Sequence, residues 1–124
     1  MIVSPQVRDA VITADFVTKL EQRLKAGVDV TIAHGYDDSK SDDAALRRLQ
    51  NLADAHDRFT LAKLKGIHEK TLLFDDHWIT TTFNWLSFRN ETRRTYRMEE
   101  GTLVSISSRV HTEYERYRAL IDDQ

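Results

Sequence analysis

The sequence predicts a layered α/β domain in which a mixed β-sheet is flanked by helices. In the first half of the chain, short apolar segments alternate with segments whose apolar residues fall at helical spacing. Four strand-like segments then follow one another before a final helical segment, and this order requires both parallel and antiparallel strands. No repeat, low-complexity stretch or linker divides the 124 residues, so we expect a single domain over 1–124.

The first half of the chain supplies two helices, each preceded by a strand. Residues 2–3 predict a short strand that stops at Pro5, because proline cannot continue a central ladder. Its abrupt start is compatible with a domain cut from a longer protein. Helical spacing predicts a helix that stops at Gly27, and the alternation of Val28, Val30 and Ile32 predicts a strand that ends near Gly35. Ser41 is expected to cap the second helix.

The second half of the chain supplies four strands and one helix. Strand-forming residues lie between breaks, and the last segment has helical spacing. These elements are expected at residues 59–64, 70–74, 77–82, 101–106 and 107–121. The two middle strands form a hairpin that turns at Asp75 and Asp76.

Composition and charge exclude several classes of protein. The formal net charge is −2, so a nucleic acid or a membrane surface would have to bind a local patch. The chain contains no cysteine, which excludes a disulfide scaffold, a cysteine nucleophile and zinc sites built on thiolates. No apolar run approaches the ~18 residues of a membrane span, and the N-terminus lacks the features of a signal peptide. We therefore expect a cytoplasmic protein with no membrane partner.

The strongest chemical signal comes from His68 and Lys70. They are two residues apart, so on a strand their side chains point to the same side. An imidazole and an ammonium are costly to bury without partners, and they suit a site for an anionic oxygen ligand. Thr82 and Asn84 are expected to repeat this parity on the partner strand, adding a hydroxyl and an amide donor. Together these side chains predict a phosphate-binding site at one edge of the sheet.

These residues resemble the HKD motif of the phospholipase D superfamily. The chain reads His68-x-Lys70-x4-Asp75 and then Thr81-Thr82-Phe83-Asn84, where the family has Gly-Ser-x-Asn after its His-x-Lys-x4-Asp. The resemblance covers nearly the whole chain, because the Ser4-Pro5 end of the first strand and the segment from Glu99 to Val104 are also similar to family members. It implies a layered phospholipase D-like fold and a phosphodiesterase activity.

The resemblance also implies a role for each matching residue. His68 would be the catalytic nucleophile that attacks phosphorus and forms a phosphohistidine. Lys70 and Asn84 would bind the non-bridging phosphate oxygens, where negative charge must be stabilised. Thr82 stands at the serine of the family pattern and would bind phosphate through its hydroxyl.

Further matches concern the surroundings of the histidine. Glu99 matches the carboxylate that orients the nucleophilic imidazole and fixes its tautomer. Asp75 matches the motif aspartate, whose role is more structural, because it bonds near the turn and not to the substrate. Thr81 departs from the pattern, because it occupies the glycine position and its β-branched side chain could crowd the phosphate. No metal and no cofactor are implied, since histidine, lysine and amide groups take their place.

A family active site uses two such motifs, with one histidine attacking and the other protonating the leaving oxygen. This chain contains one motif. A homodimer would supply the second histidine, since a two-fold interface brings identical residues face to face. The other source is a second half in a longer parent protein.

The segment after Asn84 indicates the substrate. Between residues 89 and 97 the chain carries four arginines and one glutamate, a local charge of +3. Arginines beside a phosphate site, with an aromatic ring for stacking, suit nucleic acid, and we expect DNA rather than phospholipid. The expected nucleic-acid-binding residues are Arg89, Arg93, Arg94, Tyr96 and Arg97. The alternative is a solvated loop of ion pairs.

Two functions from different classes follow from these residues. The first is a metal-independent nuclease that uses His68. The second is a catalytically degenerate module that keeps the fold for nucleic-acid binding or dimerisation, with Thr81 as a sign of lost catalysis. A phospholipase is a weaker third reading, because the sequence shows no exposed apolar loop for reaching a bilayer.

Overall fold

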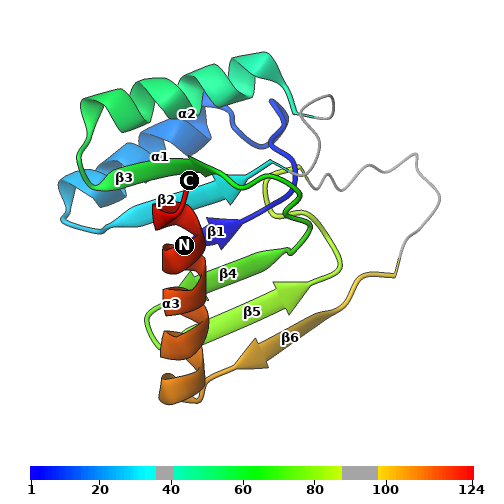
Figure 1. The fold of residues 1–124 in the computed structure, drawn as a ribbon. Helices are drawn as coiled ribbons and strands as arrows, with labels where there is room; N and C mark the ends of the chain where they lie inside the picture. Colours follow the sequence, from blue (N-terminus) through cyan, green and yellow to red (C-terminus); the bar gives the residue numbers. More distant parts are fainter. Residues whose placement is uncertain (36–40, 88–97) are drawn as a thin grey trace.

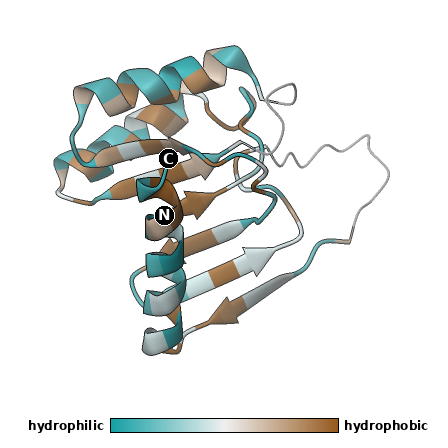
Figure 2. Cartoon of the chain, in the orientation of Figure 1, coloured by the Kyte–Doolittle hydropathy of each residue, from teal (hydrophilic) through white to brown (hydrophobic). Residues whose placement is uncertain are grey.

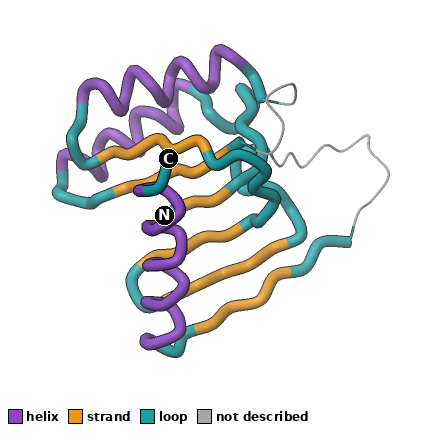
Figure 3. Tube along the Cα trace, viewed as in Figure 1, coloured by secondary structure: helices purple, strands orange, loops and turns teal. Residues whose placement is uncertain are grey.

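A computed structural model describes residues 1–35, 41–87 and 98–124. Within these ranges the chain forms a six-stranded mixed sheet and three helices (Figures 1 and 3), as the sequence predicts. The strand order across the sheet is β3-β2-β1-β4-β5-β6. In chain order the elements are β1 (Ile2–Val3), α1 (Ala14–Lys25), β2 (Val30–His34), α2 (Asp43–Ala55), β3 (Phe59–Lys63), β4 (Thr71–Phe74), β5 (His77–Thr81), β6 (Gly101–Val104) and α3 (Ser107–Asp122).

The sheet consists of a parallel half and an antiparallel half. Strands β1, β2 and β3 run parallel, because a helix crosses back between each pair. Strand β4 then pairs antiparallel with β1, and β5 and β6 add to it as antiparallel neighbours. The N-terminal strand therefore lies at the centre of the sheet and joins its two halves (Figure 1).

Helices cover the two faces of the sheet unequally. One buried cluster combines residues of α1 and α2 with Ile32 of β2. A second cluster combines Val110 and Tyr117 of α3 with Ala33, the next residue along β2. Consecutive strand residues point to opposite faces, so α1 and α2 pack on one face and α3 on the other. The apolar colouring in Figure 2 is concentrated in the strands that these helices cover.

Strand β2 differs from the expected alternation over residues 28–32. The strand begins at Val30, while Val28 lies before it and is exposed. Thr31, Ile32 and Ala33 are all buried. An interior parallel strand is covered on both faces, so period-two alternation is a poor guide to its bounds.

The expectation that Ser41 caps α2 is wrong. The N-cap residue is Asp42, and its side chain makes no capping hydrogen bond. The hydroxyl of Ser41 instead accepts a hydrogen bond from the backbone N–H of Val7 at 3.2 Å. In α1 the cap is regular, because Oγ1 of Thr13 accepts from the N–H of Phe16 at 3.1 Å.

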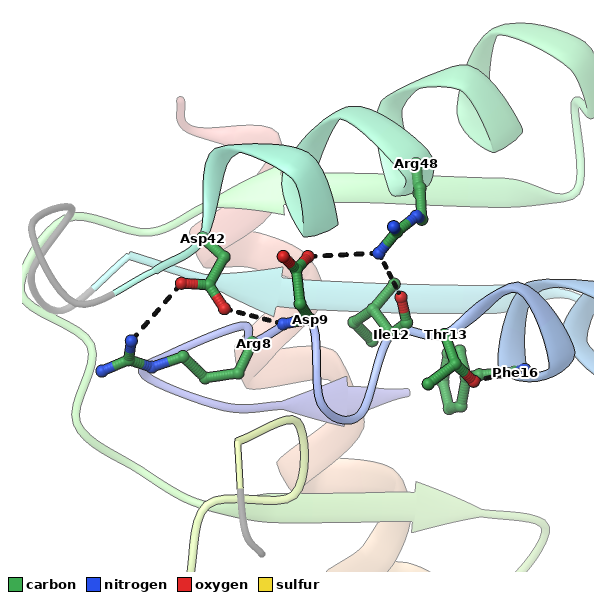
Figure 4. Close-up of polar contacts among 7 residues, drawn as sticks. All are labelled: Arg8, Asp9, Ile12, Thr13, Phe16, Asp42 and Arg48. Atoms are coloured by element: carbon green, nitrogen blue, oxygen red, sulfur yellow. Dashed lines mark hydrogen bonds and ion pairs between the residues drawn. The ribbon is translucent and has the colours of Figure 1, made fainter.

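Charged side chains fasten the segment between β1 and α1 to the start of α2 (Figure 4). The Asp42 carboxylate accepts from the N–H of Asp9 at 2.8 Å and lies 3.4 Å from Nη1 of Arg8. Arg48 donates to Oδ1 of Asp9 at 3.1 Å and to the carbonyl of Ile12 at 2.9 Å. The side chain of Asp42 thus bonds to the neighbouring segment and does not cap its own helix.

Across the part of the chain that the structure describes, no helix combines the length and the apolar character that crossing a membrane requires. Each helix contributes buried apolar residues to the clusters on the sheet, and most of its other residues are exposed or partly exposed. Figure 2 shows both apolar and polar residues along each helix.

Candidate functional site

The candidate site lies at one edge of the sheet, where the parallel strands end. Val3, the last residue of β1, pairs with Thr71 at the start of β4. Thr71 in turn pairs with Thr80, and Thr81 at the end of β5 pairs with Gly101 at the start of β6. The segments before β4, after β5 and before β6 therefore meet at the carboxyl edge of β1–β3. Open α/β sheets commonly bind ligands at this edge.

His68 and Lys70 lie just before β4, at this edge. His68 is exposed and Lys70 is partly buried. The ammonium of Lys70 donates to the carbonyl of His68 at 3.2 Å, which holds the two residues in a compact arrangement. The carbonyl of Lys70 accepts from the N–H of Thr81 at 3.0 Å, so the ladder between β4 and β5 continues to the candidate site.

The register of this ladder corrects the expected parity. Because Thr71 pairs with Thr80, Lys70 lies opposite Thr81 and not opposite Thr82. Strand β5 ends at Thr81, one residue before the expected end at Thr82. Thr82 and Asn84 therefore do not extend β5 on the face of the sheet that carries the Lys70 side chain. They belong to the segment that leaves the strand.

Thr82 and Glu99 form the closest side-chain contact at this edge. Oγ1 of Thr82 donates to Oε2 of Glu99 at 2.5 Å, and it accepts from the N–H of Glu100 at 2.9 Å. The N–H of Thr82 donates to the carbonyl of Glu100 at 3.0 Å. A hydroxyl has one proton to donate, so Thr82 would have to release Glu99 before donating to a phosphate. The resemblance assigns Glu99 to the imidazole of His68, whereas this contact ties it to Thr82.

Asn84 lies in a loop that returns to the end of β1. Its Oδ1 is buried and has no hydrogen-bond partner among the described residues, while its Nδ2 end carries the two donors that a phosphate could use. The buried hydroxyl of Ser4 accepts from the N–H of Leu86 at 3.2 Å, and the carbonyl of Leu86 accepts from the N–H of Arg8 at 2.9 Å. The Ser4-Pro5 end of β1 thus positions the loop that carries Asn84.

Asp75 lies away from the other motif residues. It occupies the turn between β4 and β5, at the opposite end of the hairpin from Lys70. Its φ of 49° is in the left-handed region, which aspartate tolerates better than most residues. This position agrees with a role in the turn and separates Asp75 from the reacting groups. The predicted turn at Asp75 and Asp76 is confirmed.

Two residues of α3 contact the segment that carries His68, and the sequence analysis did not select them. The hydroxyl of Tyr117 lies 3.2 Å from Oγ1 of Thr71. Nη2 of Arg116 lies 3.6 Å from Oε1 of Glu69. Burial raises the pKa of Tyr117 above its usual value. The seven-residue spacing between Val110 and Tyr117 is the sequence signal that places both on one helix face.

The expected nucleic-acid-binding residues fall in a part of the chain for which no structure is given. Arg89, Arg93, Arg94, Tyr96 and Arg97 all lie outside the described residues. Among residues 1–35, 41–87 and 98–124, no three histidine or acidic side chains are grouped to hold a metal ion.

The chain was compared with models of protein families, with curated proteins and with solved structures, and none of them matches it.

Proposed function

We propose that this chain is a metal-independent phosphodiesterase of the phospholipase D type that hydrolyses nucleic acid, with DNA as the favoured substrate. The observation that carries the proposal is the meeting of distant motif segments at one sheet edge. The N–H of Thr81 donates to the carbonyl of Lys70, and the hydroxyl of Thr82 donates to Glu99. An imidazole, an ammonium, an amide and a carboxylate thus share the edge where α/β sheets bind ligands.

The proposed reaction has two displacements at phosphorus. In the first, a ring nitrogen of His68 attacks, a P–N bond forms and the P–O bond to the leaving oxygen breaks. The leaving oxygen takes a proton from a general acid. In the second, a water oxygen attacks, the new P–O bond forms and the P–N bond breaks. One proton of that water returns to the group that first acted as the acid.

The neighbouring side chains would stabilise the charge that develops on the phosphate oxygens. The ammonium of Lys70 supplies a positive charge next to His68, where it already bonds to the carbonyl of that residue. The Nδ2 group of Asn84 supplies N–H donors. Oε2 of Glu99 accepts the Thr82 hydroxyl, so Oε1 would orient the imidazole of His68. The Thr82 hydroxyl would donate to phosphate only after releasing Glu99.

The general acid must come from outside the motif of this chain. We propose a second histidine from another copy in a homodimer, or from a second half in a longer parent protein. A two-fold axis would bring the His68 side chains of two copies into one shared site, where one acts as the nucleophile and the other as the acid. We also propose a cytoplasmic location for the protein.

A second function is a degenerate module that binds nucleic acid or dimerises without catalysis. Two observations favour it. Thr81 occupies the glycine position of the pattern, and its hydroxyl is committed to the carbonyl of Phe83 at 2.8 Å. Glu99 is committed to Thr82. Both contacts differ from those that the reaction would use.

The decisive assay is cleavage of labelled single- and double-stranded DNA in excess EDTA. The wild type is compared with His68→Ala and with His111→Ala, which alters an exposed histidine of α3. The proposal expects cleavage by the wild type and by His111→Ala, and a loss of at least about 10³-fold in His68→Ala. Binding by all three without cleavage would instead establish the degenerate module. Hydrolysis of phosphatidylcholine vesicles but not DNA would establish the phospholipase.

A further inference from the structure

Two residues of the segment from His68 to Thr71 contact α3. Glu69 and Thr71 both contact α3, through Arg116 and Tyr117. Lys70 lies between Glu69 and Thr71, and His68 directly precedes Glu69. These two residues are the proposed phosphate ligand and nucleophile. Lys70 continues the ladder with β5, so its side chain points to the side opposite that of Thr71, and the helix contacts of Glu69 and Thr71 flank it along the chain. His68 directly precedes Glu69 and is held by the same contact.

The inner contact is a pair of buried hydroxyls. Thr71 is 2% exposed and Tyr117 is 1% exposed, and their hydroxyl oxygens lie 3.2 Å apart. A buried hydroxyl without a partner is costly, so each member of the pair needs the other. Thr71 directly follows Lys70 and begins β4. The pair therefore fixes the strand at the point where the site segment begins.

The outer contact is a guanidinium shared between two elements. Nη2 of Arg116 lies 2.6 Å from Oε1 of Glu113 and 3.6 Å from Oε1 of Glu69. Its guanidinium carbon lies 4.3 Å from the centre of the Tyr117 ring. Arg116 is held by its own helix on two sides, so its contact with Glu69 joins a fixed group to the segment that carries His68.

We infer that Tyr117 and Arg116 are positioning residues, which set the places of His68 and Lys70 from α3 at the other face of the sheet. This inference rests on the proposed function, because it assigns these residues a purpose in that reaction. Misplacement of a reacting group by about 1 Å can lower a rate by about 10²-fold. Loosening either contact should therefore lower kcat more than it changes KM.

The sharpest test removes the two hydroxyls singly and together. Tyr117→Phe leaves the hydroxyl of Thr71 buried without its partner, and Thr71→Val does the reverse, so both should lower Tm. The double variant has no buried unpaired hydroxyl, so its Tm should recover most of the loss. Its kcat should stay about tenfold or more below the wild type, because the anchor is still missing. Tyr114→Phe, at an exposed tyrosine of α3, is the matched control and should change neither quantity.

Recovery of kcat together with Tm in the double variant would overturn the inference, because a purely structural role would then explain everything. The outer contact has its own comparison. Arg116→Gln should lower kcat, and Arg116→Lys should restore part of it. Arg118→Gln, which removes an ion pair within α3, should have no effect. Equal kcat in Arg116→Gln and Arg118→Gln would remove Arg116 from the proposal.

A readout that needs no activity separates this inference from the proposed function. The ring proton resonances of His68 can be assigned by their loss in His68→Gln. They should shift in Tyr117→Phe and in the double variant, and stay in place in Tyr114→Phe. Unchanged His68 resonances in Tyr117→Phe would overturn the inference whatever the activity. Shifted resonances in a protein that cleaves no phosphodiester would leave the positioning role standing and defeat the proposed reaction.

Discussion

The backbone N–H of Thr81 donates to the carbonyl of Lys70 at 3.0 Å. This bond joins the segment before β4 to the end of β5, and it places a threonine directly across from the lysine of the motif. The next residue, Thr82, leaves the strand and bonds to Glu99. The arrangement of the candidate site therefore depends on where the ladder between β4 and β5 ends.

Thr81→Gly should raise kcat/KM while lowering stability. Glycine restores the residue that the family pattern has at this position and removes a β-branched side chain from the proposed phosphate site. The cost is about 1 kcal/mol from glycine in a strand, together with the hydrogen bond to the carbonyl of Phe83. Thr80→Gly, one residue earlier in β5, is the control, with a similar stability loss and no gain in rate. A fall in kcat/KM for Thr81→Gly would show that its hydroxyl is needed.

Glu99→Gln and Glu100→Gln form a matched pair of neighbouring substitutions. Glu99 accepts the Thr82 hydroxyl through its side chain, whereas Glu100 contacts Thr82 through its backbone, which the substitution leaves in place. We expect about a 10²-fold lower kcat for Glu99→Gln and a change within twofold for Glu100→Gln. Single-turnover cleavage of a labelled DNA in EDTA measures both. If both substitutions lowered kcat equally, the rate would depend on the negative charge of this segment and not on the position of the Glu99 carboxylate.

Ser4→Ala should destabilise the fold and loosen the loop that carries Asn84. The hydroxyl of Ser4 is buried and accepts from the N–H of Leu86, which would lose its partner. An unpaired buried N–H costs about 1–3 kcal/mol, and about 4 °C of Tm corresponds to each kcal/mol in a domain of this size. Ser108→Ala at an exposed position of α3 is the control. If the Tm of Ser4→Ala stayed within about 1 °C of the wild type, the N–H of Leu86 would have found another partner, and the prediction would be wrong.

The free energy of unfolding should fall at alkaline pH through Tyr117. Burial raises the pKa of Tyr117 in the folded state above its ordinary value of 10.0. Above pH 10.0 the unfolded chain therefore loses this proton first and the folded state keeps it, so stability is full below that pH and falls as the pH rises. Tyr117→Phe cannot ionise and should lack this part of the loss. Urea titrations between about pH 8 and pH 11 give the free energy of unfolding of the wild type and of Tyr117→Phe at each pH. If this free energy fell equally steeply with pH in both proteins, Tyr117 would not be the group responsible.

Helical spacing, strand alternation and turn residues predict the order of the elements and the mixed sheet, which the structure confirms. The Asp75 turn was predictable because acidic residues at a tight turn interrupt two strand-forming segments. The bounds of β2 were not predictable, because a strand that is buried on both faces shows no alternation of apolar and polar residues. The predicted cap of α2 was wrong. Ser41 and Asp42 are both suitable N-cap residues, and their contacts with distant residues decide between them.

The site was predictable only in part. Spacing alone placed His68 and Lys70 together, and the fold brings them to the same edge as the segments of Thr82 and Glu99. The position of Thr82 relative to Lys70 was wrong, although the predicted turn was right. A turn at Asp75 and Asp76 pairs Phe74 with His77 and therefore brings Lys70 opposite Thr81, so even-numbered residues of one strand share a face with odd-numbered residues of the other. The contact between Tyr117 and Thr71 spans 46 residues. No local pattern indicates such a pair.

In the proposed reaction, His68 forms a covalent bond to phosphorus. The most direct measurement mixes the protein with a short labelled DNA in EDTA, quenches the reaction at alkaline pH and determines the mass of the intact chain and its peptides. We expect a nucleotide-linked phosphoryl adduct on the peptide that contains His68 in the wild type and in His111→Gln, and no adduct in His68→Gln. An adduct on any other residue, or cleavage by His68→Gln at the wild-type rate, would contradict the proposed reaction.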